Sequence, residues 1–216
     1  MKSNKDLVEY LEKSGYITRD DIKRAFLFVD RKDFVPKEFS SYAYEDEPIP
    51  IPELQTTSAP SVIAKMLEMS EIKKGQKVLE IGTGSGYLTA LLAYLVGDNG
   101  IVVSMEIFEK VYEFARRNLS KYNFRNIKLV LGDGTLGYPE MAPYDVIICG
   151  AAAPYHVPKS WIDQLKINGI IVTPRQLGFT QWIYKLRKLP DESIKEEDKW
   201  GPVIFVPLKG KYGARS

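Results

Sequence analysis

The chain has 216 residues, 44% of them apolar and 27% charged, with a formal net charge of +2, one cysteine and one histidine. This composition is that of a protein with a sizeable core, and it excludes an intrachain disulfide and a Cys-rich metal site. Lys and Arg are spread beside Asp and Glu without a polyanion-binding tract, which argues against nucleic acid as a partner. The chain has neither an apolar run of the roughly 18 residues that span a membrane nor a signal-peptide core, so we expect a cytoplasmic protein without membrane contact or metal.

The first sixty residues predict two helices followed by a long irregular segment. Apolar residues recur at helical spacing over 4–13 and again over 20–29. Residues 33–60 hold five prolines and show no sustained period, which is typical of a functional loop or a binding lid. Disorder is the alternative, but the aromatic and aliphatic residues of this segment favour packing.

From residue 60 onward, helical and strand patterns alternate. We expect helices over 61–69, 86–96, 107–122 and 160–167, and strands over 77–81, 101–106, 126–133, 144–150, 169–174, 181–188 and 202–208. Such alternation predicts an α/β fold with a doubly wound, mostly parallel sheet. The last two strands follow each other without a helix between them, so one of them should run antiparallel.

A glycine-rich turn follows the first strand of this sheet. The sequence KVLEIGTGSGYLTA places Gly82, Gly84 and Gly86 between a strand and a helix, where backbone can approach a nucleotide-like ligand closely. The dinucleotide fingerprint GxGxxG is not met, because Tyr87 stands at its third glycine, and the phosphate loop GxxxxGK[ST] is absent. The shorter GxGxG after the acidic Glu80 resembles motif I of the S-adenosylmethionine-dependent methyltransferases, whose sheet is Rossmann-like.

Acidic residues also mark the ends of the next two strands. Glu106 ends the second strand, where a carboxylate can accept hydrogen bonds from ribose hydroxyls. Asp133 and Gly134 follow the third strand, where an aspartate can accept from an adenine amine. Each residue alone has a structural alternative, as a turn residue or a charge at a helix N-terminus, but the three strand ends together favour one adenosyl ligand. The candidate cofactor contacts are Glu80, Gly82, Thr83, Gly84, Gly86, Glu106, Ile107, Asp133 and Gly134.

The sequence around the fourth strand argues against a nucleobase as methyl acceptor. The Asp/Asn-Pro-Pro-aromatic motif of many amino-methyltransferases is absent, since residues 148–155 read ICGAAAPY. Cys149 lies in an apolar strand, where cysteine is usually a small buried residue. His156 has no acidic partner nearby in sequence and is interpreted as a surface residue.

Several longer stretches resemble the protein-L-isoaspartate O-methyltransferase family. QTTSAPSVIAKMLEM (55–69) is similar to its substrate loop, GDGTLGYPEMAPYDVIICGAAAP (132–154) to its central run, and PVIFVPLKG (202–210) to its C-terminal end. The resemblance implies S-adenosylmethionine as cofactor, S-adenosylhomocysteine as product and isoaspartyl proteins and peptides as substrates. It makes Ser58 the active-site residue and implies a substrate site of Thr57, Ser58, Ala59, Pro60 and Val206.

The chain departs from the family pattern at three positions. Ser61 stands where the family often has His or Tyr, Gly150 where it usually has Thr, and Pro174-Arg175-Gln176 where it often has Pro-Val-Gly. These departures bear on the shape of the peptide pocket. We expect residues 1–59 to form a helical extension with the substrate loop, and residues 60–216 to form a single compact cofactor-binding domain.

The chemistry implied by the resemblance needs no general base, because a carboxylate with a pKa near 4 is already ionised at pH 7. Ser58 can donate one hydrogen bond that orients this carboxylate, or it can cap the helix that begins near Pro60. Two alternative functions remain: a methyltransferase of the same fold acting on a small molecule or RNA, and a non-catalytic binder of an adenosyl ligand. The sequence leaves self-association open.

Overall fold

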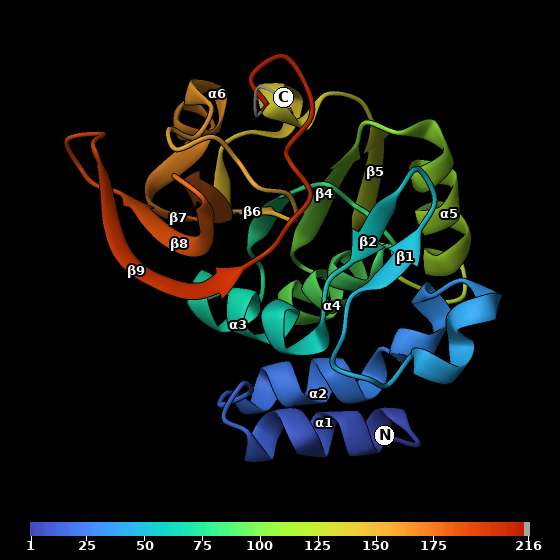
Figure 1. The fold of residues 1–216 in the computed structure, drawn as a ribbon. Helices are drawn as coiled ribbons and strands as arrows, with labels where there is room; N and C mark the ends of the chain where they lie inside the picture. Colours follow the sequence, from blue (N-terminus) through green and yellow to red (C-terminus); the bar gives the residue numbers. More distant parts are fainter. Residues whose placement is uncertain (214–216) are drawn as a thin grey trace.

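A seven-stranded sheet organises the computed structural model, which describes residues 1–213. Its strand order is β5-β4-β3-β6-β7-β8-β9 (Figure 1). The strands are β3 (Lys77–Ile81), β4 (Ile101–Glu106), β5 (Ile127–Leu131), β6 (Tyr144–Cys149), β7 (Leu165–Leu177), β8 (Thr180–Lys188) and β9 (Ile194–Val203). The strands from β5 to β7 pair in parallel, and β8 pairs antiparallel with both neighbours. The predicted doubly wound, mostly parallel sheet is confirmed.

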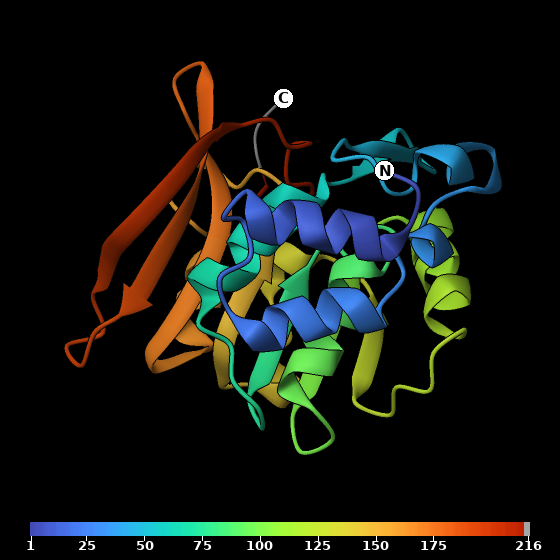
Figure 2. The ribbon, with the colours of Figure 1, turned by 90° about the horizontal axis from the view of Figure 1, so that it is seen from below.

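Helices cover both faces of the sheet because strand side chains alternate between two cores. Val78 and Val102 point into the core beneath the longer helices, whereas Leu79 and Val103 point into the opposite one. The first face carries α1 (Asn4–Lys13), α2 (Asp20–Phe28), α3 (Pro60–Ser70), α4 (Tyr87–Val96) and α5 (Glu109–Leu119). The opposite face carries η3 (Gly134–Leu136), η4 (Pro139–Met141) and α6 (Lys159–Asp163). Figure 2 shows α1 and α2 side by side as an outer layer over α3 and α4.

Two predicted elements near the C-terminus are wrong. The strand expected over 202–208 lies earlier, because β9 ends at Val203 and residues 204–208 leave the sheet. As an edge strand, β9 is mostly exposed and charged, so it lacks the apolar alternation that marks a strand in sequence. The helix expected over 160–167 ends at Asp163, because Leu165 begins β7 and pairs with Tyr144.

The proline-rich segment is ordered, so the disorder alternative is wrong. It forms the short helices η1 (Arg31–Phe34) and η2 (Lys37–Tyr42), followed by a hairpin of β1 (Ile49–Ile51) and β2 (Gln55–Thr57). Val35, Ala43 and Ile49 form a small core of their own. Figure 1 shows the hairpin beside α5, and an ion pair of 2.9 Å joins Glu53 in the hairpin turn to Lys110. Across residues 1–213, no helix has the length and apolar character needed to cross a membrane.

Candidate active site

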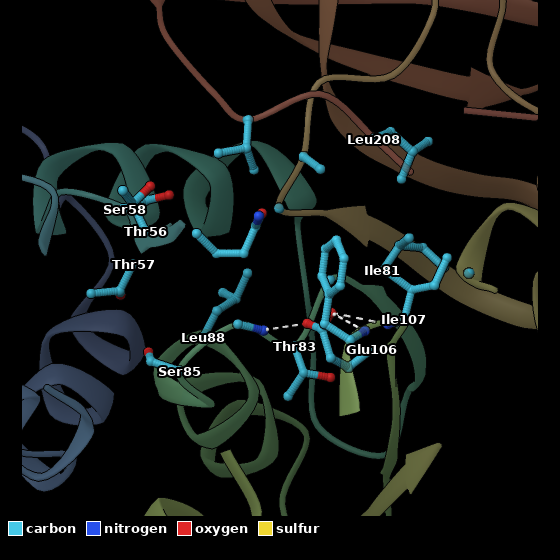
Figure 3. Close-up of a pocket in the computed structure, with 18 of the residues that line it drawn as sticks. Thr56, Thr57, Ser58, Ile81, Thr83, Ser85, Leu88, Glu106, Ile107 and Leu208 are labelled. Atoms are coloured by element: carbon cyan, nitrogen blue, oxygen red, sulfur yellow. Dashed lines mark hydrogen bonds between the residues drawn. The ribbon is translucent and has the colours of Figure 1, made fainter. Parts of the chain in front are cut away.

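A cavity at the carboxyl ends of the parallel strands collects residues from distant parts of the chain. Strand β2 and the residue after it contribute 55–58, α3 contributes Ile63 and Met66, and the turn after β3 contributes 82–85. The end of β4 contributes 105–108, and the segment after β9 contributes 206–209. Figure 3 shows Thr57 and Ser58 on one side of this cavity and Glu106 with Ile107 on the other. This is the edge where open α/β sheets bind ligands.

The glycine turn presents open backbone to the cavity. Gly82 and Gly84 have φ angles of +83° and +58°, which L side chains rarely adopt. A Cβ atom at either position would meet no protein atom closer than 3.9 Å, so the space beside them is free for a ligand. Gly86 has another role, because a Cβ there would lie 3.1 Å from the side chain of Leu119, outside the cavity. Thr83 lines the cavity together with Gly82 and Gly84.

Glu106 holds the floor of the cavity together through three backbone hydrogen bonds. Its carboxylate accepts from the N–H groups of Gly84 at 3.0 Å, Ile107 at 2.9 Å and Phe108 at 3.1 Å. Burial raises the pKa of Glu106 above its ordinary value, although these three bonds oppose the rise. Two of these bonds go to Oε1 and one to Oε2, so Oε2 keeps a lone pair that can accept from a ligand. Ile107, which is partly exposed, lines the cavity beside it.

Glu80 lies below the glycine turn and does not line the cavity. Its side chain is fully buried and accepts a hydrogen bond of 2.5 Å from the Thr89 hydroxyl. Within the described chain its other carboxylate oxygen has no partner, and burial raises the pKa of Glu80 to about 8. The Ser104 hydroxyl lies 2.6 Å from that of Thr83, so a buried polar cluster supports the turn from beneath.

Asp133 also lies outside the cavity, although Gly134 lines it. The Asp133 carboxylate accepts from the N–H and hydroxyl of Thr135 at 2.8 and 2.6 Å, and from the N–H of Lys211 at 2.7 Å. Burial opposes ionisation, but these bonds hold the pKa of Asp133 below its ordinary value. In this structure Asp133 therefore holds the C-terminal segment next to Gly134 at the edge of the cavity.

The predicted substrate residues surround the start of α3. Thr57 and Ser58 line the cavity, and Val206 faces them from the C-terminal segment, where its carbonyl accepts from the Ala152 N–H at 2.8 Å. Ala59 is the N-cap of α3 without a side-chain hydrogen bond, and Pro60 is its buried first residue. The interpretation of Ser58 as a helix cap is therefore wrong, and its hydroxyl has no cap role to fulfil.

A second cavity adjoins the first on the substrate side. Both cavities are lined by Thr56, Ser58, Gly150 and Val206, and Ala59 lines only the second. Pro60 lines neither. Ser58 therefore lies on the boundary between the first cavity and the second.

The three departures from the family pattern lie in different places. The backbone N–H of Ser61 donates to Asp46 at 2.8 Å, which ties α3 to the irregular segment. A Cβ atom at Gly150 would lie 3.2 Å from the carbonyl oxygen of Gly82, so glycine lets two strand ends approach. Arg175 lies outside both cavities, stacked 3.8 Å above the ring of Tyr184. Of these positions, only Gly150 thus lines the two cavities.

Arg31 is a residue that the sequence patterns did not single out. Its guanidinium is fully buried and donates to four backbone carbonyl groups. Their oxygens belong to Ala43 at 3.0 Å, Glu45 at 2.9 Å, Glu47 at 2.8 Å and Ser58 at 3.2 Å. Burial lowers the pKa of Arg31 to about 10, so the group stays charged at pH 7. The cation thus fixes the backbone of the substrate loop at Ser58.

The remaining reactive side chains lie away from the cavity. His156 is exposed, as predicted, and packs edge-on against Tyr155. Cys149 is buried in β6, as predicted, and burial raises the pKa of its thiol to about 12. Neither residue lines either cavity.

Comparison with known proteins gives one consistent result. The family described as protein-L-isoaspartate(D-aspartate) O-methyltransferase matches residues 2–213. The chain is 44% identical over 212 residues to a protein-L-isoaspartate O-methyltransferase of Pyrococcus abyssi, covering 98% of this chain and 96% of that one. It is 43% identical over 209 residues to one of Ignicoccus hospitalis, covering 96% and 97%. A solved structure of a putative member from Plasmodium falciparum, in complex with S-adenosyl-L-homocysteine, matches with a TM-score of 0.86 at 27% identity, covering 97% and 99%.

Proposed function

Because the chain belongs to the protein-L-isoaspartate O-methyltransferase family, we propose that it transfers a methyl group from S-adenosylmethionine to the α-carboxyl group of L-isoaspartyl residues in damaged proteins and peptides. The observation that carries the proposal is the shared cavity. It brings Ser58 together with the glycine turn and the end of β4, which lie far from it in sequence.

The lining of the cavity fits the cofactor. The open backbone at Gly82 and Gly84 accommodates a ligand pressed against the turn, and Oε2 of Glu106 offers an acceptor for a ligand hydroxyl group. Ile81, Met105 and Leu88 supply an apolar surface for the uncharged parts. We assign cofactor contact to Gly82, Thr83, Gly84, Glu106, Ile107 and Gly134, and a supporting role beneath or beside the site to Glu80, Gly86 and Asp133.

When bound, S-adenosylmethionine supplies a sulfonium methyl group, which a carboxylate oxygen of the substrate takes as the carbon–sulfur bond breaks, leaving S-adenosylhomocysteine. The carboxylate is ionised at pH 7, so the protein has to align it and strip it of water rather than deprotonate it. The Ser58 hydroxyl is free to donate a hydrogen bond to the carboxylate. Thr57 and Val206 line the same cavity.

The two parts of the chain divide this work. Residues 1–59 provide the hairpin and the Arg31 contacts that shape the substrate loop. The part of the chain from residue 60 to residue 213 provides the sheet, the glycine turn and the acidic strand end. The two parts meet at Ser58, where the methyl acceptor has to lie.

The test compares methyl transfer to two peptides that differ only in an aspartyl or an isoaspartyl linkage. Only the isoaspartyl peptide should be methylated. Ser58→Ala should lower kcat/KM for it about tenfold, the value of one hydrogen bond to a charged group. Its affinity for S-adenosylhomocysteine, measured by calorimetry, should change by less than about twofold.

Ser61→Ala is the matched control, because Ser61 lies three residues away and lines neither cavity. It should leave both quantities near their original values. Methylation of neither peptide despite cofactor binding would disprove the proposed substrate. Equal losses in the two serine variants would disprove the role of Ser58.

A further inference from the structure

The second cavity has a composition that sets it apart from the cofactor side. Its volume is about 420 Å³, within the range of small-ligand pockets. All of its lining residues are uncharged, and its outer wall is formed by Val62, Trp200, Val203 and Ile204. A charged group that entered this cavity would lose hydration without gaining a counter-charge.

Ile204 is the unusual residue of this wall. Ile204 is 97% exposed, although the backbone on either side of it is held in place: before it, Val203 pairs with Gln181 of β8. The neighbouring Phe205 exchanges two hydrogen bonds with the side chain of Gln181, of 2.6 and 3.2 Å, and Phe205 itself is buried. The next residue accepts from Ala152. Ile204 is thus an apolar side chain presented to solvent from a fixed backbone, at the mouth of a cavity.

We propose that this second cavity binds the side chain of a residue adjacent to the isoaspartyl residue, and that it selects an apolar side chain over a charged one. The inference rests on the proposed function. It identifies the residues that determine which damaged sites are repaired most readily: Val62 on α3, and Trp200, Val203 and Ile204 at and beyond the end of β9.

The occupant follows from continuity with the first cavity. Because Ser58, Thr56, Gly150 and Val206 line both cavities, a peptide whose carboxylate lies at Ser58 has its neighbouring residues at the second cavity. Successive residues of an extended chain are about 3.3–3.6 Å apart, so only a residue next to the isoaspartyl group is within reach. Burying its apolar side chain also covers the exposed surface of Ile204, which stabilises the complex.

The test uses isoaspartyl peptides in which the preceding or the following residue is leucine, serine or glutamate. At one of these two positions, kcat/KM should be about tenfold higher for leucine than for serine, and lower again for glutamate. The difference should lie in KM, because the cavity holds a part of the peptide that does not react. Ile204→Lys should remove the preference for leucine and raise kcat/KM for the glutamate peptide.

Phe179→Lys is the matched control, because Phe179 is also a fully exposed apolar residue but lies in the β7–β8 turn, outside both cavities. It should leave the order of the peptides unchanged. Equal kcat/KM for all neighbours at both positions would overturn the inference and leave the proposed function intact, as would equal shifts in the two lysine variants. Failure to methylate any isoaspartyl peptide would overturn the proposed function itself, and this inference with it.

Discussion

The two sides of the active site are built in different ways. The cofactor side consists of a turn and a strand end that belong to adjacent strands of one sheet, and Glu106 connects them through three backbone hydrogen bonds. The substrate side consists of a hairpin and a C-terminal segment that are far apart in the chain. On this side Arg31 holds the two chain segments that flank the hairpin, because it donates to four carbonyl groups between residues 43 and 58.

The difference shows which part of such a site is set by regular structure. A parallel sheet fixes the distance between its strand ends, so the cofactor side needs only glycines and a carboxylate at the right positions. A loop has no such lattice, and its backbone groups need partners from elsewhere. On this side a single buried cation replaces the hydrogen bonds that a sheet would provide.

The largest effect should come from breaking the substrate side alone. Arg31→Met fills a similar space but leaves four carbonyl groups without their donor. We expect the free energy of unfolding to fall by about 4 kcal/mol, since each unsatisfied buried group costs about 1–3 kcal/mol. In the folded fraction, KM for the isoaspartyl peptide should rise more than the dissociation constant of S-adenosylhomocysteine. Urea unfolding and steady-state kinetics measure the two effects.

Arg31→Lys keeps the charge and some of the donors, and it should recover part of both losses. A control is Arg19→Met, because Arg19 also donates to a backbone carbonyl, that of Ile72 at 2.7 Å, but lies away from the loop. Proportional weakening of peptide and cofactor binding in Arg31→Met would show that the two sides are not separately built.

The reverse experiment breaks the cofactor side. Glu106→Ala removes the acceptor of the Gly84, Ile107 and Phe108 N–H groups and the proposed acceptor of the ligand hydroxyls. Calorimetry should show that affinity for S-adenosylhomocysteine falls about 100-fold, which corresponds to about 3 kcal/mol. The exposed Glu109→Ala, three residues further on, should change it little. An affinity within about twofold of the original in Glu106→Ala would remove Glu106 from the cofactor site.

A smaller effect, on the pH dependence of stability, is expected from the buried Glu80 beneath the glycine turn. The pKa of Glu80 is raised from 4.5 to about 8, first by burial and also by repulsion from Glu106. The folded state therefore binds a proton that the unfolded state has released, and the contribution of Glu80 to stability falls as pH rises from 4.5 to 8. Between pH 6 and 7 this loss should be about 1 kcal/mol.

Glu80→Gln has no proton to lose, so its unfolding free energy relative to the unmodified protein should increase by that amount over the same interval. Urea unfolding at the two pH values measures the difference, and the exposed Glu140→Gln serves as the control. A difference that stays constant with pH would mean that Glu80 is ionised in the folded protein.

The cofactor side was largely predictable from sequence, because its signals are local. Gly82, Gly84 and Glu106 stand in short motifs next to apolar strands, and the parallel sheet brings those strand ends together. Glu80 and Asp133 have the same local signal, yet they do not line the cavity. Which way a carboxylate at a strand end turns depends on partners such as Thr89 and Lys211, which no local pattern specifies.

The substrate side was predictable only by resemblance. The periodicity of apolar residues did not predict the hairpin, since β1 and β2 have only three residues each. It also misplaced the last strand, because the apolar residues of 204–208 line the two cavities instead of pairing in the sheet. Arg31 lies in RKDFVP among charged neighbours. Arg31 could be recognised only from the fold, which shows that the buried carbonyl groups of the irregular segment need hydrogen-bond donors.

Arg31 organises the substrate loop much as a bound metal ion would, because one cation is shared by several carbonyl oxygens that accept its hydrogen bonds. If residues 43–47 or Ser58 moved away alone, the buried guanidinium would lose part of its hydrogen bonds while it kept its full charge. This is costly, because a buried charge needs polar partners. We therefore expect the loop to open as one cooperative unit together with η1, rather than to fray residue by residue from its tip. In such an enzyme the substrate loop is already ordered before a damaged protein binds, so the conformational entropy lost on binding comes mainly from the flexible substrate.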